Sequence, residues 1–188
     1  MFKNCIGYGI ETVILKCTDL LDNIDYVSFV KDRRKTMRQP HQILAFPYKK
    51  DEKGNYLYGI FCRKGKTERW QAIAGGVEEG ETFLEACKRE ANEEAGISYD
   101  AKVIELKSIS TMPVVNVTKE FIWGEDVYLI YEHCFGIDAT NESIRLSHEH
   151  TKMEWLSYED AIARLKWDSN KNALWELNWK LLNNKTDI

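Results

Sequence analysis

The feature that most constrains this chain is the run of glycine and acidic residues from Gly75 to Ile97. Thr82 stands three residues before Glu85, which is the spacing of a capping box, in which each side chain bonds the other residue's backbone N–H. Gly96 can adopt the left-handed conformation that ends a helix without steric cost. The spacing therefore predicts a helix that starts at Phe83 and ends just before Gly96.

One side of this predicted helix is apolar. At about 100° per residue, that side collects Phe83, Leu84, Ala86, Cys87, Ala91 and Ala95. Glu90 and Glu94 fall inside the same arc, where two carboxylates four residues apart repel each other and lose hydration. Glu93 lies about 60° round from Glu90, so we expect three carboxylates to project from adjacent turns. A divalent cation among them would stabilise this arrangement.

Mg²⁺ and Mn²⁺ suit such a site because these hard cations take carboxylate oxygens and share the rest of their coordination with water and phosphates. The turns at Gly75, Gly76 and Gly80 let backbone groups approach the site closely. A run of charges is more often a solvated helix face. The position of Glu90 and Glu94 on the apolar side favours a metal site instead.

Length and charge narrow the class of protein. The 188 residues suit a single domain with a substantial core. The net charge of −4 argues against a stable nucleic-acid partner, whose binding face would be basic, but not against a small phosphorylated substrate. The five cysteines are odd in number and contain no Cys-x-x-Cys pair, so we expect reduced thiols in a cytoplasmic location. No stretch approaches the roughly 20 apolar residues that a membrane helix needs, so we expect no membrane segment.

The remaining chain alternates strand-like and helical segments. Apolar periodicity predicts strands at 43–48, 56–63, 70–74, 102–111, 127–137 and 153–156, the first two joined as a hairpin. Ser157 should cap one helix, and Asp168 or Ser169 a last one with the apolar stripe Ala173, Leu174, Leu177, Leu181 and Leu182. We assign no role to residues 1–36 beyond an extension that packs on the core or on a second subunit.

Several side chains outside the acidic helix are candidates for the site. Arg63, at the end of a predicted strand, is either a phosphate contact or a surface arginine. Phe121 and Trp123 lie in a connection, where aromatic rings can stack a flat heterocycle, although aromatic residues more often pack in cores. His148 and His150 are poor zinc candidates because no thiolate accompanies them.

The acidic stretch resembles the signature of the Nudix hydrolases. The matching positions are Gly75, Glu81, Arg89, Glu90, Ala91, Glu93, Glu94, Gly96 and Ile97, without a gap. The resemblance implies an α/β fold in which a mixed sheet is sandwiched between helices. It implies a Nudix hydrolase domain over residues 37–188, preceded by the extension 1–36.

Within that family, residues 37–182 resemble the bacterial dihydroneopterin triphosphate pyrophosphohydrolases. The matching segments are Arg38-Gln39-Pro40, Trp70-Gln71 with the following glycine loop, and Glu149-His150 ahead of Trp155-Leu156. Trp70 thereby joins Arg63, Phe121 and Trp123 as a substrate-binding candidate.

The resemblance also implies a role for each acidic residue. Glu90 and Glu94 are expected to be the main Mg²⁺ ligands, Glu93 a third or supporting one, and the Gly75 carbonyl an addition. The general base comes either from a later loop, at Glu149, or from the helix, at Glu90. We favour Glu149, as base or as a further metal ligand.

Two neighbouring residues, one basic and one acidic, should hold these ligands in place. Arg89 is expected to orient Glu93 or Glu85 one turn away. Glu81 should hold the glycine loop, either through Arg89 or through water on the metal.

The expected activity is that of a Mg²⁺-dependent pyrophosphohydrolase. The family hydrolyses a nucleoside diphosphate linked to another moiety. The expected small-molecule substrate is therefore a nucleoside or pterin triphosphate, with dihydroneopterin triphosphate or dATP as candidates, or another nucleoside diphosphate derivative. A Nudix-fold sensor that binds a nucleotide without cleaving it is the alternative. An isopentenyl diphosphate isomerase would share the fold but carry a catalytic cysteine and glutamate instead of a complete signature. A homodimer is left open.

Overall fold

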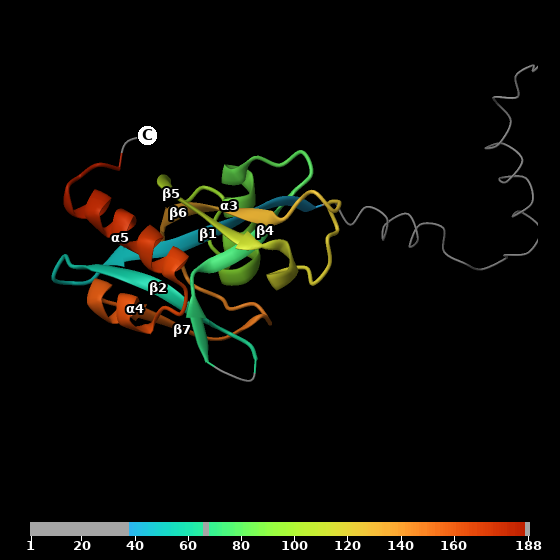
Figure 1. The fold of residues 1–188 in the computed structure, drawn as a ribbon. Coiled ribbons are helices and arrows are strands. Elements are labelled where there is room, and N and C mark those ends of the chain that lie inside the picture. Colours follow the sequence, from blue (N-terminus) through green and yellow to red (C-terminus); the bar gives the residue numbers. More distant parts are fainter. Residues whose placement is uncertain (1–37, 66–67, 187–188) are drawn as a thin grey trace, which may run out of the picture. The chain divides into compact units, whose positions relative to one another are not determined.

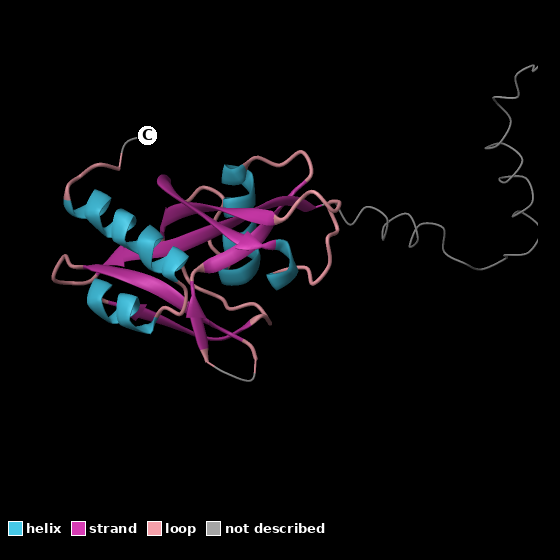
Figure 2. Cartoon of the chain, in the orientation of Figure 1, coloured by secondary structure: helices cyan, strands magenta, loops and turns pink. Residues whose placement is uncertain are grey.

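The computed structural model describes residues 38–65 and 68–186, and it shows a mixed sheet with helices on both of its faces (Figures 1 and 2). The described helices are α3 (Phe83–Ala95), α4 (Tyr158–Arg164) and α5 (Asp168–Leu182). This is the predicted α/β class. The predicted extension over residues 1–36 lies outside the described residues. Each described helix is too short or too polar to span a bilayer.

Seven strands form the described sheet. They are β1 (Arg38–Lys50), β2 (Tyr56–Arg63), β3 (Arg69–Gln71), β4 (Ile73–Glu78), β5 (Val103–Pro113), β6 (Leu129–Asp138) and β7 (His150–Leu156), with a 3₁₀ turn, η1 (Val114–Asn116), after β5. The main order is β3-β2-β1-β6-β5, while β4 pairs with β1 and β7 with β2. The β1–β6 pair is parallel and the other pairs are antiparallel.

The predicted strands are present, with shifted boundaries. The hairpin of β1 and β2 is confirmed, although β1 begins five residues earlier than predicted, at Arg38. The single strand predicted at 70–74 is in fact two strands, because Ala72 leaves the ladder and donates its N–H to Asn170 Oδ1 (2.8 Å). β7 starts at His150 and not at Met153.

Helix α3 has the predicted capping. Thr82 accepts a hydrogen bond from the Glu85 N–H, and Glu85 accepts one from the Thr82 N–H (2.8 Å). Gly96 lies in the left-handed region (φ 69°) and donates to the last carbonyls of the helix. The predicted apolar side is wrong at Leu84, which is 45% exposed, because the helix turns this residue away from the sheet.

Helix α5 begins differently from the prediction. Trp167 occupies the N-cap position without a side-chain hydrogen bond, and Asp168 is already the first helical residue. The predicted stripe is buried except for Leu182, which is 64% exposed.

Two core clusters lie on opposite faces of the sheet. Side chains alternate along β1, so that Leu44 and Phe46 belong to the cluster beneath α4 and α5. Ile43 and Ala45 belong to the cluster beneath α3. The buried face of α3 therefore packs on apolar side chains of the sheet, and this places its buried carboxylates, those of Glu90 and Glu94, between helix and sheet.

Candidate functional site

The carboxylate of Glu90 lies against the backbone of Gly75. Gly75 pairs with Ile43 in the register of β4 on β1, directly under α3. A methyl group at Gly75 would lie 1.8 Å from Cδ of Glu90 and about as close to its oxygens. A side chain at position 75 and the observed Glu90 position therefore exclude each other.

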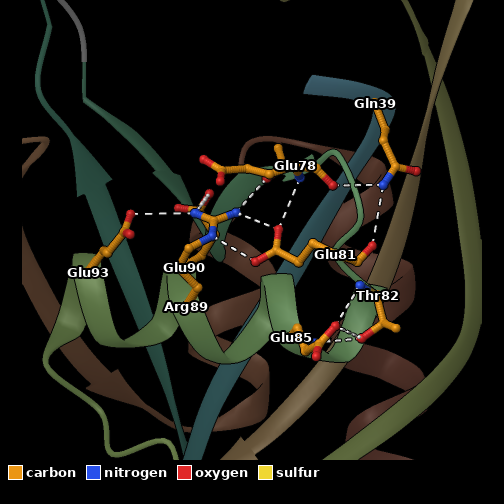
Figure 3. A network of polar contacts seen from close by, with 9 residues as sticks. Gln39, Glu78, Glu81, Thr82, Glu85, Arg89, Glu90 and Glu93 are labelled. Atoms are coloured by element: carbon orange, nitrogen blue, oxygen red, sulfur yellow. Dashed lines mark hydrogen bonds and ion pairs between the residues drawn. The ribbon is translucent and has the colours of Figure 1, made fainter. Parts of the chain in front are cut away.

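Arg89 is the centre of the polar network in Figure 3. Its guanidinium donates two hydrogen bonds to Glu81, at 2.8 and 3.0 Å, and one to the Gly76 carbonyl at 2.8 Å. It also donates to Glu90 Oε1 at 2.7 Å, and to Glu93 only at 3.5 Å. Arg89 thus joins the helix to the glycine loop, and the predicted contacts of Arg89 with Glu93 and with Glu81 are both present.

The expected alternative, an Arg89 contact with Glu85, is absent from the hydrogen bonds and ion pairs of the described residues, because Glu85 is engaged in the capping box.

The glycine loop is also held by hydrogen bonds that the sequence did not indicate. Gln39 Nε2 donates to the carbonyls of Glu78 (2.8 Å) and Glu81 (3.3 Å) (Figure 3). The first residues of β1 therefore fix the loop that precedes α3.

Burial sets the electrostatics of these acids. Burial raises the pKa of Glu90, and the charges of Glu94 and Glu93 raise that pKa further. The hydrogen bond and charge of Arg89 only partly offset this rise, so the pKa of Glu90 lies above its ordinary 4.5. Burial also acts to raise the pKa of Glu81, but hydrogen bonds from Arg89 and from the Glu78 N–H outweigh it, and the pKa falls below its ordinary value.

The three carboxylates project from adjacent turns and have different partners. Glu90 is turned toward Arg89, Glu94 toward His150 at 2.8 Å, and the Glu93 side chain is 58% exposed. Across residues 38–65 and 68–186, no three His, Cys, Asp or Glu side chains gather closely enough to hold one ion.

Glu90 and Glu94 nevertheless fit a hard divalent cation. Both are buried, at 9% and 6% exposure, and both offer oxygen atoms on the side of α3 that faces the sheet. The backbone of Gly75 adjoins Glu90 with no Cβ in between. Oxygen donors from two carboxylates and a backbone are the type of partner that Mg²⁺ and Mn²⁺ prefer.

The loop before β7 brings Glu149 next to Arg63. Their side chains are 3.7 Å apart and both are about half-exposed. The loop is tied to β2 by the Lys64 N–H, which donates to the Glu149 carbonyl (2.8 Å), and to α3 by the Ser147 N–H, which donates to the Glu94 carbonyl (3.0 Å). These two predicted site residues therefore lie side by side, Arg63 at the end of β2 and Glu149 in a loop that is attached to the end of the acidic helix.

The aromatic candidates lie in different surroundings. Trp70 is 6% exposed and packs in the core cluster beneath α4 and α5, on the face opposite α3, with Arg164 over its ring. Phe121 is partly exposed and packs edge-on against Tyr128. Trp123 donates its indole N–H to the Arg38 carbonyl and lines a small pocket together with Arg38, Gln39, His41, Gln42, Gly76, Val117 and Ile130.

A histidine pair that no sequence pattern indicated lies near the start of α3. His41 Nδ1 and His133 Nε2 are 3.1 Å apart on the adjacent strands β1 and β6. The ring of Phe83, the first residue of α3, stacks on His133 at 3.7 Å between centroids. Burial lowers the pKa of both histidines, and their mutual repulsion lowers that of His133 further.

Comparison with known proteins assigns this arrangement to a family. The family model of the NUDIX domain matches residues 50–176. The dihydroneopterin triphosphate diphosphatase of Escherichia coli (strain K12) is 30% identical over 151 residues, which cover 74% of this chain and 93% of that protein.

Solved structures agree in fold. A protein of Listeria monocytogenes str. 4b F2365, described as a NUDIX hydrolase, is 39% identical with a TM-score of 0.72, over 80% of this chain and 99% of that one. The Escherichia coli dihydroneopterin triphosphate pyrophosphohydrolase is 26% identical with a TM-score of 0.62, over 77% and 99%. The Ap4A hydrolase of C. elegans has a TM-score of 0.60 at 20% identity, over 76% of this chain and 98% of that one, which shows a likeness of fold.

Proposed function

The chain belongs to the Nudix hydrolase family, and from that premise we propose that it is a Mg²⁺-dependent pyrophosphohydrolase, with Mn²⁺ as a substitute, that cleaves a nucleoside or pterin triphosphate into pyrophosphate and a monophosphate. Dihydroneopterin triphosphate is the first candidate substrate, because a relative at 30% identity carries that name. dATP is the second candidate.

The observation that carries the metal assignment is the charge imbalance around α3. Within the part of the chain that the structure describes, the carboxylates of Glu81, Glu90 and Glu93 share their ion pairs with one guanidinium, that of Arg89, and the carboxylate of Glu94 is paired only with His150. Glu90 and Glu94 are buried against the apolar cluster beneath α3, where an uncompensated charge is costly. A divalent cation held by Glu90 and Glu94 would balance this charge and neutralise the phosphate oxygens that repel an attacking water.

The chain's own residues have distinct roles in this proposal. Arg89 keeps Glu90 and the glycine loop in place through its hydrogen bonds. Glu149 accepts the proton of the attacking water, since its carboxylate is half-exposed on a loop tied to the end of α3. Arg63 beside it binds a phosphate oxygen. Glu90 is the alternative base, because its raised pKa suits proton transfer.

The heterocycle of the substrate is assigned to the aromatic residues after η1. Trp123 lines the pocket beside Gly76, and Phe121 is exposed in the same connection. Glu93 and the Gly75 carbonyl remain supporting metal ligands. Trp70 is left out because its ring is buried on the other face of the sheet.

The experiment compares Glu94→Gln with Glu68→Gln, whose carboxylate pairs with Lys152 on the surface. Pyrophosphate release from dihydroneopterin triphosphate and from dATP is measured in Mg²⁺ and in chelator. Glu94→Gln should lower kcat at least about 100-fold, since even residues that only support a metal ligand are worth 10- to 100-fold. Its thermal unfolding temperature should stay close to that of the wild type, because the amide oxygen of glutamine can still accept a hydrogen bond from His150 Nε2.

Near-normal turnover in Glu94→Gln, with Glu68→Gln also normal, would contradict the metal assignment. Tight dATP or pterin binding by calorimetry without pyrophosphate release in excess Mg²⁺ would favour the non-catalytic sensor. The complete set of signature carboxylates favours the hydrolase, because a binding module does not need all of them.

A further inference from the structure

His150 is buried next to Glu94 and bonds it directly. Its side chain is 1% exposed, and its Nε2 lies 2.8 Å from Glu94 Oε2. The two residues are 56 positions apart and come from β7 and α3. The other ring nitrogen, Nδ1, is buried and has no hydrogen-bond partner among the described residues.

The direction of this hydrogen bond follows from the chemistry of its partner. An ionised carboxylate only accepts hydrogen bonds, so Nε2 carries the hydrogen and donates it to Glu94. Nδ1 is then an acceptor that receives nothing. Most buried polar atoms are paired, and an unpaired one carries a desolvation penalty. The His150 ring thus bonds Glu94 through Nε2 while Nδ1 stays without a partner. Such a local conflict is typical of functional sites.

The surroundings hold the ring in place. The Phe61 ring packs against it at 5.2 Å between centroids. The loop that leads to His150 is attached to the last turn of α3 by the Ser147 N–H, which donates to the Glu94 carbonyl at 3.0 Å. Backbone and side chain of Glu94 are therefore both bound by the same short segment.

Glu90 and Glu94 each have a separate partner. Glu90 accepts from Arg89 within the same helix, while Glu94 accepts from His150 on a different element. A carboxylate with one oxygen held by a donor keeps the other oxygen in a fixed direction, and such supporting hydrogen bonds raise metal affinity in known sites.

We propose that His150 is a positioning residue, which orients the Glu94 carboxylate for the divalent cation by donating a hydrogen bond from Nε2. The inference rests on the proposed function, since it takes Glu94 as a metal ligand. It assigns His150 neither to the metal nor to the substrate.

The test compares two substitutions of similar length at position 150. His150→Gln keeps an N–H donor that can reach Glu94, whereas His150→Met fills the same space without one. Tyr58→Phe is the control, because it removes a buried hydrogen bond to Asn178 (2.7 Å) on the opposite face of the sheet. Mn²⁺ affinity is measured by calorimetry and by the electron paramagnetic resonance signal of free Mn²⁺, and thermal unfolding is recorded for each variant.

His150→Met should weaken Mn²⁺ binding about 10- to 100-fold and raise the Mg²⁺ concentration for half-maximal activity similarly, with a smaller change in kcat at saturating Mg²⁺. His150→Gln should stay within a few-fold of the wild type, and Tyr58→Phe should lose stability without losing Mn²⁺ affinity. Added to Glu94→Gln, His150→Met should have little further effect on metal binding, because the two residues act as a unit.

Wild-type Mn²⁺ affinity in a folded His150→Met would overturn the inference and leave the proposed function standing, as would equal losses in the Met and Gln variants. If His150→Met does not fold, a folded His150→Gln with Mn²⁺ affinity reduced as far as that of Glu94→Gln would have the same consequence. Absence of Mn²⁺ binding by the wild type would instead remove the proposed function itself.

Discussion

Gly75 and Glu90 show at the scale of single residues how the site depends on close packing. The carboxylate occupies the space that any other side chain at position 75 would fill. Glu90 is thereby held between Arg89 and the backbone of β4. The glycine is needed here for close approach, and not for a left-handed conformation, which this part of β4 does not adopt.

Gly75→Ala should therefore impair metal binding. The new methyl group would overlap the Glu90 carboxylate, so either the side chain moves or α3 shifts away from β4. We expect Mn²⁺ affinity to fall at least about 10-fold and the free energy of unfolding to fall by about 1–3 kcal/mol. Calorimetry and urea unfolding measure the two effects.

Gly65→Ala is the matched control, because its new methyl group would meet only the far end of the Arg69 side chain at 3.3 Å. That variant should resemble the wild type. Unchanged Mn²⁺ affinity in Gly75→Ala would be inconsistent with the observed contact of Gly75 and Glu90.

The raised pKa of Glu90 predicts a pH dependence of metal binding. Only the ionised carboxylate is a metal ligand, so a proton competes with the cation for Glu90, and burial favours the protonated form. As the pH falls, affinity should therefore weaken at a higher pH than for an ordinary glutamate of pKa 4.5. Mn²⁺ titrations between about pH 5 and pH 7, in buffers of different ionisation enthalpy, measure the protons released.

In Glu90→Gln the loss of Mn²⁺ affinity on acidification should occur at lower pH, and fewer protons should be released on Mn²⁺ binding. The Mn²⁺ affinity of this variant should be lower overall. Identical pH profiles for Glu90→Gln and the wild type would show that another group causes the dependence.

Helix α3 is the element that joins the parts of the site. Its N-terminal capping box fixes where the helix starts, and Glu90 follows seven positions after its first residue, Phe83. Its buried small residues, such as Ala91 and Ala95, let it lie close to the sheet. The start of the helix and its apolar face together determine that Glu90 and Glu94 face inward.

At this scale, Thr82→Ala should cost about 1 kcal/mol of unfolding free energy, the usual cost of losing an N-cap side chain. Thr82 is exposed, and its hydroxyl bonds the Glu85 N–H (3.2 Å) and carboxylate (2.7 Å). Thr82→Ser should regain most of the loss because it keeps the hydroxyl. Urea unfolding compares the three proteins, and equal losses in the Ala and Ser variants would argue against the cap as the cause.

For the whole molecule, the two described core clusters draw their members from residues between Ile43 and Leu181. Both faces of the sheet are thus covered by α3, α4 and α5 (Figure 1). We predict that residues 37–188 are a domain in their own right, separate from the extension 1–36.

A shortened chain of residues 37–188 should unfold in one cooperative transition and keep the Mg²⁺-dependent activity of the full chain within a few-fold. Urea unfolding followed by circular dichroism, together with the pyrophosphate assay, tests this. A shortened chain that is aggregated or has lost its cooperative transition would show that the domain boundary is wrong.

Much of this fold could be predicted because the signals are local. The capping box, the Gly96 stop and the phase of α3 involve residues at most five positions apart. The alternation of β1 and β2 likewise predicted a hairpin. The strand predicted at 70–74 could not be resolved into two, because its break depends on Asn170, 98 residues away.

The sequence by itself determined which groups can belong to the site. Helical geometry places Glu90 and Glu94 on one face of the helix, and the glycines directly precede that helix in the chain. Only the tertiary structure decided which partners these groups have. His150 reaches Glu94 across 56 positions, Trp70 is buried away from α3, and Glu93 remains exposed. The physical reason is that helix phase depends on neighbouring residues, whereas burial and hydrogen-bond partners depend on how distant strands pair.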